Sequence, residues 1–248
     1  MKLYRGMRAR NAHRHIWNTQ ALKEKWEPKL QAINWEWEDL EFTSVLEGVR
    51  PACLSVVPKE KYLQRLTWAM NNGLKIRVVR SVKRFEGFAN SYEAGDDYLV
   101  TAVAKDVAHL EEPEKYLGYP DCCQRFFAAM WPTVTDPMWQ WAVGGEKPDV
   151  NTVEVLANPY SDPTLRYAGV RFAPHIPCNP MCPGSVKLGQ EFAALMKPEL
   201  RDARIQLLTE LHSWDCYRSM AIVKTEPFRL VVGSVPAAER YVVNVTGS

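Results

Sequence analysis

Four cysteines and a histidine, which lie in two short segments far apart in the chain, constrain the fold more than any other feature. The first segment contains Cys122 and Cys123, and the second contains His175, Cys178 and Cys182. A chain of 248 residues can form its own hydrophobic core, so it does not need disulfides to hold it together. Cysteines grouped in this way are typical of metal binding or thiol chemistry. We therefore expect the fold to bring both segments to one site.

The first segment reads Gly118-Tyr-Pro-Asp-Cys-Cys-Gln-Arg-Phe-Phe127. Asp121 is a favourable helix N-cap, and Gln124 three residues later completes the pattern of a capping box. Cys122 and Cys123 then fall in the first turn, where the helix dipole and unpaired backbone N–H groups favour the thiolate form. Three apolar side chains are expected to anchor this helix in the core: Phe126, Phe127 and Met130.

The second segment reads His175-Ile-Pro-Cys-Asn-Pro-Met-Cys-Pro-Gly-Ser185. A regular helix is unfavourable here because proline lacks the backbone donor and clashes with the preceding turn. The three prolines are Pro177, Pro180 and Pro183. We expect a rigid loop that presents Cys178, Cys182 and His175 to the site. Ser185 is expected to cap the helix that follows.

Four thiolates suit either zinc or an iron–sulfur cluster. Neighbouring cysteines reach two irons of one cubane more easily than they reach a single zinc, and Cys182–Pro183 is the kind of pair that ends some cluster motifs. The sequence therefore favours a [4Fe–4S] cluster slightly over zinc. Zinc held by Cys122 or Cys123 together with His175, Cys178 and Cys182 remains open, as do a metal-free thiol pair and simple packing. His175 is either a ligand, a catalytic proton-transfer group or an ordinary hydrogen-bonded side chain.

Other chemically capable side chains carry weaker signals. Cys53 and Cys216 are expected to be buried as small hydrophobic side chains, and His109 and His212 to be structural. Four residues are candidates for substrate binding: Arg125, Lys187, Trp214 and Lys224. For Arg125, a solvent-facing position without a ligand is the competing interpretation.

The cysteine motifs resemble those of the domain-of-unknown-function 483 family, Gly-Tyr-Pro-x-Cys-Cys-x-x-Phe-Phe and His-x-Pro-Cys-x-x-x-Cys. Trp214 and the segment 221–228 are similar to that family's Trp-Ser and Ala-Glu-Val-Lys-Thr-Pro-x-Phe elements, although Asp215 follows Trp214 and Glu226 is an additional residue. The resemblance covers roughly residues 50–235. It implies that the four cysteines and His175 act together, with Lys224 and Thr225 near them, and it implies no reaction.

Composition and charge narrow the class of protein. Hydrophobic residues make up 46% and charged residues 24%, which is ordinary for a globular protein. No apolar run suggests a secretory signal or a membrane span, so we expect a cytoplasmic protein with reduced thiols. The net charge is +2, yet residues 1–30 alone carry +6. This basic arm suggests nucleic acid or an acidic partner, and a solvated first helix is the alternative.

The hydrophobic pattern predicts an α+β or mixed α/β fold with one main domain, in which helices pack on a mixed sheet and the Pro-rich Cys/His loop is irregular. We expect a Trp-containing arm over residues 1–45, with a helix near 21–37, and a core over residues 46–248. Predicted strands cover 52–57, 74–79, 98–103 and three segments of 217–245, with turns at 226–227 and 233–237. Predicted helices cover 59–71, 111–131, 185–196 and 198–211, and the second of these has a break at 118–120. Residues 132–183 are predicted to be irregular.

These observations favour a metal- or iron–sulfur-dependent enzyme that acts on a small molecule, a nucleotide or a nucleic-acid base by sulfur transfer or modification. No phosphate-binding loop, dinucleotide fingerprint or nucleophile elbow is present. One alternative is a nucleic-acid or protein-binding module with a structural zinc site. The other is a metal-free thiol enzyme.

Overall fold

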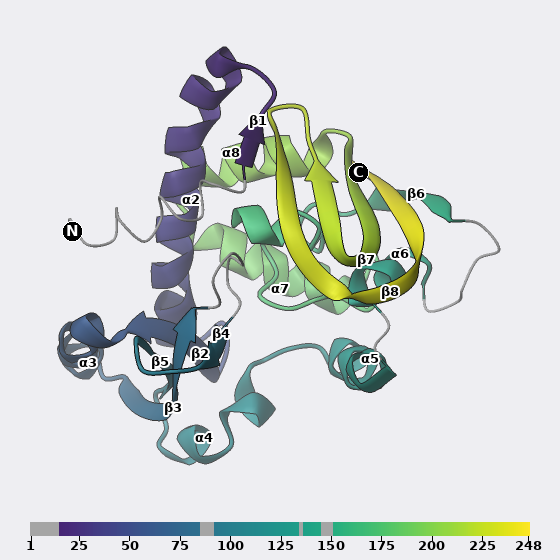
Figure 1. The fold of residues 1–248 in the computed structure, drawn as a ribbon. Coiled ribbons are helices and arrows are strands. Elements are labelled where there is room, and N and C mark those ends of the chain that lie inside the picture. Colours follow the sequence, from purple (N-terminus) through teal and green to yellow (C-terminus); the bar gives the residue numbers. More distant parts are fainter. Residues whose placement is uncertain (1–14, 85–91, 134–135, 145–150) are drawn as a thin grey trace. The chain divides into compact units, whose positions relative to one another are not determined.

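The computed structural model describes residues 15–84, 92–133, 136–144 and 151–248 (Figure 1). It divides into two compact units, which we call the cysteine unit (residues 1–35 and 120–248) and the small unit (36–119). Helix α2 (Gln20–Leu46) includes the predicted helix near 21–37 and contributes residues to both units. The division predicted at residue 45 stays a prediction.

The small unit is built on one antiparallel sheet with the strand order β2-β5-β3-β4. Its strands are β2 (Ala52–Pro58), β3 (Lys75–Arg84), β4 (Tyr92–Ala94) and β5 (Tyr98–Ala104). The strands predicted at 52–57, 74–79 and 98–103 are confirmed, and β3 runs five residues further than predicted. The predicted helix at 59–71 is present as the 3-10 turn η1 (Lys59–Lys61) followed by α3 (Tyr62–Asn71). Two short elements follow, α4 (Ala108–Glu111) and η2 (Pro113–Tyr116).

The core of the small unit forms where the end of α2 packs on β2 and β5. Cys53 is fully buried in β2 and belongs to the same apolar cluster as Phe42 and Val103. The guanidinium of Arg50 is also buried. It pairs with the carboxylate of Glu41, and its Nε donates to Ser44 Oγ at 2.8 Å. The buried charge is therefore compensated inside the unit, as a buried cation requires.

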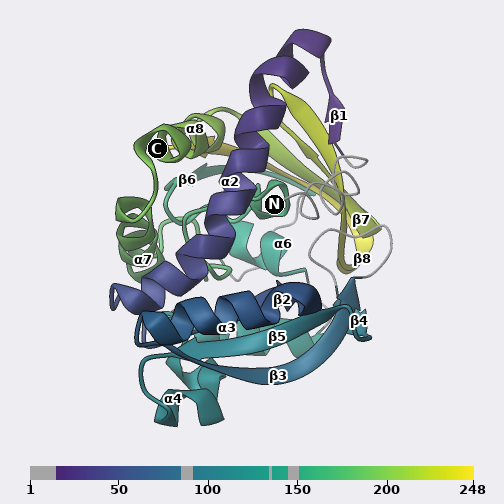
Figure 2. The ribbon, with the colours of Figure 1, turned by 90° about the vertical axis from the view of Figure 1, so that its left-hand side faces the viewer.

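The cysteine unit contains a second, mixed sheet whose central strand is β8 (Phe228–Gly247). β8 pairs antiparallel with β7 (His212–Lys224) and β1 (His15–Trp17), and parallel with β6 (Thr152–Ala157). Figure 2 shows α7 (Pro183–Ala194) and α8 (Pro198–Thr209) on one side of this sheet. The predicted class, helices packed with a mixed sheet, is confirmed.

The C-terminal prediction of three strands is wrong, because residues 212–247 form one hairpin of two long strands. The predicted turn at 226–227 is correct, and Thr225 N donates to Phe228 O across it at 2.9 Å. The predicted turn at 233–237 does not end a strand. The register shifts there instead, between Arg218 and Met220 of β7, and Arg218 has a φ of 56°. A bulge therefore absorbs the extra residues of β8 while the ladder continues.

Residues 132–183 are more regular than predicted, since they contain α6 (Pro137–Ala142) and β6. Asp136 caps α6 by accepting a hydrogen bond from Met138 N at 2.8 Å, and Pro137 occupies the first turn, where a missing donor costs nothing. The helices predicted at 185–196 and 198–211 are confirmed as α7 and α8, each beginning at a proline.

Two predicted helix caps are wrong. Helix α5 (Asp121–Met130) has Pro120 as its N-cap, so Asp121 is already its first residue and no capping box forms. Helix α7 has Cys182 as its N-cap, so Ser185 lies inside its first turn. Because proline fixes φ near its helical value, Pro120 and Pro183 set where the two helices start without a polar cap.

Candidate metal centre

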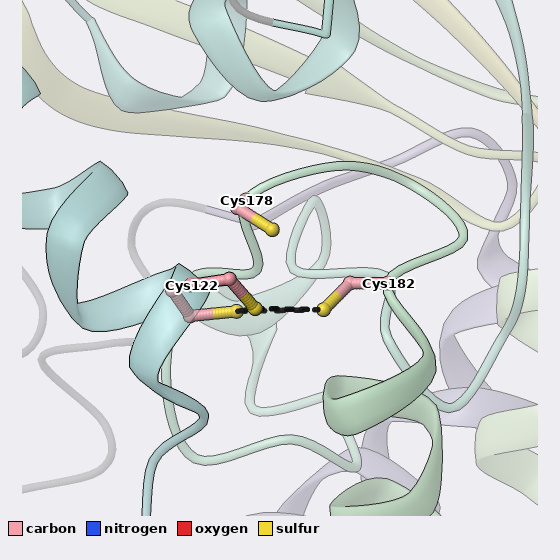
Figure 3. Close-up of side chains that lie close together, drawn as sticks. Cys122, Cys178 and Cys182 are labelled. Atoms are coloured by element: carbon pink, nitrogen blue, oxygen red, sulfur yellow. Dashed lines mark hydrogen bonds between the residues drawn. The ribbon is translucent and has the colours of Figure 1, made fainter.

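The four cysteines of the two motifs come together at the N-terminal ends of two helices. Cys122 and Cys123 lie in the first turn of α5, as predicted, and Cys182 is the N-cap of α7. Cys178 lies in the loop before α7 (Figure 3). All four residues belong to the cysteine unit. The prediction that the two motifs converge on one site is therefore confirmed.

The sulfur atoms form a compact group. The four Sγ atoms lie within 4.8 Å of one another, which makes them a group able to hold a metal ion. The Sγ atom of Cys182 is 3.7 Å from that of Cys122 and 3.6 Å from that of Cys123. The Sγ atoms of the adjacent residues Cys122 and Cys123 are 3.9 Å apart. The first turn of α5 thus directs two consecutive side chains to the same point.

The four sulfurs differ in their access to solvent. Cys123 and Cys182 are buried, with exposed fractions of 2% and 1%. We call these two the inner pair. Cys122 is exposed and Cys178 is half-buried, and we call these the outer pair. The group therefore has one side in the protein and one side at the surface.

Hydrogen bonds from a neighbouring loop hold the Pro-rich segment in place. The carbonyl oxygen of Pro180 accepts from the backbone N–H of Asn158 at 3.1 Å and from the hydroxyl of Ser161 at 2.8 Å. Within the segment, Met181 N donates to the side chain of Asn179 at 3.0 Å, which makes an Asx turn. The predicted rigid loop thus has a physical basis in turn chemistry and in contacts with the loop that follows β6.

A glycine permits the two cysteine segments to approach closely. A Cβ atom at Gly184 would lie 2.9 Å from the Cβ and Cγ atoms of Pro120, a distance that real Cβ atoms essentially never show. Pro120 directly precedes α5, and Gly184 lies in the first turn of α7. The absence of a side chain at Gly184 therefore allows the two helix starts to approach this closely.

Burial and hydrogen bonding act in opposite directions on the thiols. Burial raises the pKa of Cys123 well above its ordinary value, and it raises the pKa of Cys178 to about 11. Burial would also raise the pKa of Cys182, but hydrogen bonds from the hydroxyl and backbone N–H of Ser185, together with those from the Cys123 and Cys122 thiols, outweigh it and lower that pKa to about 7. Cys182 thus has the environment of a thiolate at the positive end of a helix.

His175 lies behind the sulfur group rather than in it. Its side chain is buried, and its Nε2 atom is 2.8 Å from Ser185 Oγ. The same hydroxyl is 3.2 Å from Cys123 Sγ. The structure therefore connects His175 to the site through Ser185 and does not include it among the four grouped ligand atoms. Its predicted roles as ligand and catalytic group stay predictions.

The structure places the four candidate substrate-binding residues in different environments. Arg125 is exposed on α5, and the Lys187 ammonium lies 4.0 Å from the Glu191 carboxylate on the surface of α7. The Lys224 ammonium donates to Asp215 at 2.9 Å. Trp214 is buried at 1% exposure. The substrate-binding role of these four residues stays a prediction. The helix anchor predicted at Phe127 is wrong, since its ring is 39% exposed and stacks on Trp131.

Sequence reasoning missed three residues that build the site. Gly184 and Ser161 had no assigned role, and Ser185 was assigned to a cap. The signal for Gly184 was its place directly after Cys182–Pro183, where a close approach of another chain segment is a common reason for glycine. No sequence pattern around Ser161 identifies it, because its hydroxyl donates to the backbone carbonyl of Pro180, which lies in a different segment of the chain.

The comparisons with known proteins found no match. No protein-family model, curated protein or solved structure matches the chain. The resemblance to the domain-of-unknown-function 483 family therefore stays a prediction. Among the residues that the structure describes, no helix is both long enough and apolar enough to cross a membrane.

Proposed function

We propose that this protein binds one zinc ion through Cys122, Cys123, Cys178 and Cys182, and that the ion is a structural centre joining the start of α5 to the loop before α7. The observation that carries the proposal is the sulfur spacing. Zinc–sulfur bonds of about 2.3 Å in a tetrahedron separate the sulfurs by about 3.8 Å. The three sulfur–sulfur distances of 3.6, 3.7 and 3.9 Å lie close to that value.

The same spacing argues against the cubane that the sequence slightly favoured. A [4Fe–4S] cluster bonds each ligand sulfur to a different iron, which places the ligand sulfurs farther apart than the ligands of one ion. The expectation that adjacent cysteines reach a single zinc less easily is also weakened, because the Sγ atoms of Cys122 and Cys123 already have a suitable separation. A single iron in a four-sulfur site has the same geometry, so metal analysis must separate the two ions.

A structural role follows from the number of protein ligands. Four cysteines close the tetrahedron and leave no position for a substrate, which is typical of structural zinc. This arrangement fits a binding module better than the sulfur-transfer or modification enzyme suggested by the sequence. Partners such as nucleic acid remain proposals, and the most basic part of the arm, residues 1–14, lies outside the described residues.

One observation favours an enzyme as the second candidate. Cys122 is exposed, so a substrate can approach this ligand from solvent and displace it from the metal. Such a site would have three permanent sulfur ligands and one exchangeable position, as catalytic zinc requires.

The test is metal content together with a Cys122→Ala variant. The protein is purified without chelators and oxygen, and zinc, iron and acid-labile sulfide are measured per chain. One zinc without sulfide supports the proposal, whereas iron with sulfide or no metal contradicts it. Loss of zinc in Cys122→Ala indicates a structural four-sulfur site. Retention of zinc with three sulfur ligands indicates the open site of the second candidate.

A further inference from the structure

The side chains of His175 and Ser185 make a continuous hydrogen-bonded path to the inner pair of sulfurs. His175 Nε2 lies 2.8 Å from Ser185 Oγ, and Ser185 Oγ lies 3.2 Å from Cys123 Sγ. All three side chains are buried, with exposed fractions of 8%, 0% and 2%. Water therefore has little access to these groups, and each must find its hydrogen-bond partners inside the protein.

We propose that Ser185 and His175 are positioning residues for the metal centre, and that they act in series by donating a hydrogen bond to the Cys123 ligand. This inference rests on the proposed function. Metal-binding cysteine is a thiolate without a proton. In its contact with Cys123 the hydroxyl of Ser185 is then the donor and the sulfur the acceptor, and the same hydroxyl is also close enough to Cys182 to stabilise that thiolate. The Ser185 oxygen is left to accept, and His175 Nε2–H is the donor that faces it.

The path explains why a buried histidine and a buried serine lie beside the site without belonging to the sulfur group. Cys123 is the more deeply placed sulfur of α5, with an exposed fraction of 2%, and a buried thiolate is costly unless it accepts a hydrogen bond. A hydrogen bond from Ser185 offsets that cost and fixes the direction in which the sulfur points. Groups that orient a metal ligand in this way commonly change metal affinity by about 10–100-fold when they are removed.

Helix α7 contributes the geometry of the path. Ser185 lies in the first turn of α7, two residues after Pro183, and Cys182 is the N-cap of the same helix. One rigid helix start therefore supplies both a ligand from the inner pair and the hydroxyl that supports the other. His175 is delivered by the loop that also contains Cys178.

The experiment uses the full chain loaded with Co²⁺, whose thiolate-to-metal charge-transfer absorption reports the electron density on the sulfurs. In Ser185→Ala the thiolate loses a hydrogen bond, its electrons become easier to transfer, and the absorption moves to longer wavelength. The dissociation constant for Zn²⁺, measured by competition with a chromophoric chelator, is expected to rise by about 10–100-fold. His175→Leu is expected to shift both quantities in the same direction by a smaller amount.

Three further variants separate a relay from general damage. His175→Gln keeps an N–H donor at the end of the side chain and is expected to retain the wild-type absorption. The double variant Ser185→Ala with His175→Leu is expected to match Ser185→Ala alone, because groups acting in series are not additive. The matched control is Ser44→Ala, which removes an equally buried helical hydroxyl from the small unit and leaves the cobalt spectrum unchanged.

The possible results are distinct. If wild-type protein shows no four-thiolate cobalt spectrum, the proposed metal site is wrong and the relay is wrong with it. If wild-type protein binds cobalt and Ser185→Ala has the same spectrum and Zn²⁺ affinity, the metal site stands and the relay is overturned. Additive effects in the double variant also overturn it. If Ser185→Ala fails to fold, His175→Leu and His175→Gln still decide the question.

Discussion

The six cysteines of this protein fall into two groups, which differ in the kind of secondary-structure element that carries them. Cys53 and Cys216 lie inside the strands β2 and β7 and are completely buried. Burial raises the pKa of Cys53 to about 12, and Cys216 Sγ donates a weak hydrogen bond to Asp136 at 3.7 Å. Both side chains serve as small packing groups.

The cysteines of the candidate metal centre instead occupy two helix starts and a loop. There, backbone N–H groups without intrahelical partners and the helix dipole stabilise negative charge. A helix start or a loop does not by itself lower the pKa of a thiol, since burial raises the pKa of Cys123 and of Cys178. The comparison teaches that hydrogen-bond donors close to the sulfur, as Ser185 provides for Cys182, decide whether a buried cysteine favours the thiolate. Cys182 and Cys53 both have little exposed surface, yet the pKa of Cys182 is lowered to about 7 whereas that of Cys53 is raised to about 12.

The largest expected effect is the loss of metal when one inner sulfur is removed. Cys182→Ala is expected to lower the zinc content from about one ion per chain to near zero, because a structural tetrahedral site needs all four ligands. Cys216→Ala, in the same compact unit, is expected to keep its zinc. Elemental analysis after dialysis against a weak chelator measures both. Equal loss of zinc in the two variants would break the comparison.

A smaller effect is expected from closing the gap between the helix starts. The Cβ atom of Gly184→Ala would meet Pro120, so α5 and α7 must move apart and the sulfur group must widen. We expect zinc affinity to fall by about 10–100-fold, as for other changes that misplace metal ligands. Chelator competition measures this change.

The control for that variant is Gly48→Ala in the small unit. An added Cβ atom there meets nothing within 4 Å, but φ is +76°, so the cost is backbone strain of about 1–2 kcal/mol. Its zinc affinity should equal that of wild type. If Gly184→Ala also keeps full affinity, the close approach does not set the sulfur spacing.

Removing a strand cysteine is expected to affect packing alone. Cys53→Ala deletes one sulfur from the apolar cluster of the small unit and is expected to lower the free energy of unfolding by about 1 kcal/mol. Metal content and cobalt spectrum should stay as in wild type. Urea unfolding with and without zinc checks both parts, and a zinc-dependent change in this variant would contradict the separation of the two groups.

The smallest effect concerns a buried polar cluster that needs no metal. The ring of His212 donates through Nδ1 to the Glu210 carbonyl at 2.8 Å, and its Nε2 is 3.1 Å from Asp162 Oδ2. Burial lowers the pKa of His212, but the charge of Asp162 outweighs burial, so the pKa is raised above 6.5. A histidine whose pKa is raised by folding stabilises the folded state fully when the pH is below its pKa in the unfolded chain. This stabilisation is lost as the pH rises through its pKa in the folded protein.

The contribution of His212 to the free energy of unfolding therefore declines above neutral pH. The contribution of bound zinc increases with pH, because zinc binding releases thiol protons. In metal-free protein, the unfolding free energy should fall from pH 6 to pH 9, and His212→Gln should flatten this slope. A slope of equal size in His212→Gln would show that another group is responsible.

The sequence predicted which segments form helices and strands better than it predicted where those helices and strands begin and end. The strands β2 and β5 and the helices α3, α7 and α8 follow from local hydrophobic patterns and prolines. The continuous strand β8 does not, because residues 233–237 have the composition of a turn, and only pairing with β7 keeps them in the sheet. Helix α5 has Pro120 as its N-cap and helix α7 begins at Pro183, and neither N-cap side chain makes a capping hydrogen bond.

The sequence predicted the four cysteines of the candidate site but not the contacts of the residues around them. Cys122, Cys123, Cys178 and Cys182 were identified from residue type and position. The close approach of Gly184 to Pro120, which brings the two cysteine segments together, has no local sequence signature. The position of His175 behind Ser185 depends on the path of the loop. Such features arise from packing between distant segments, which periodicity and motif spacing do not encode.

The most direct test of the metal centre is X-ray absorption at the zinc edge of protein purified without chelators or oxygen. We expect about one zinc per chain, surrounded by four sulfur atoms at about 2.3 Å, with no nearby second metal. Iron with acid-labile sulfide, or a protein that contains no metal and gains none on addition of zinc, would contradict this account.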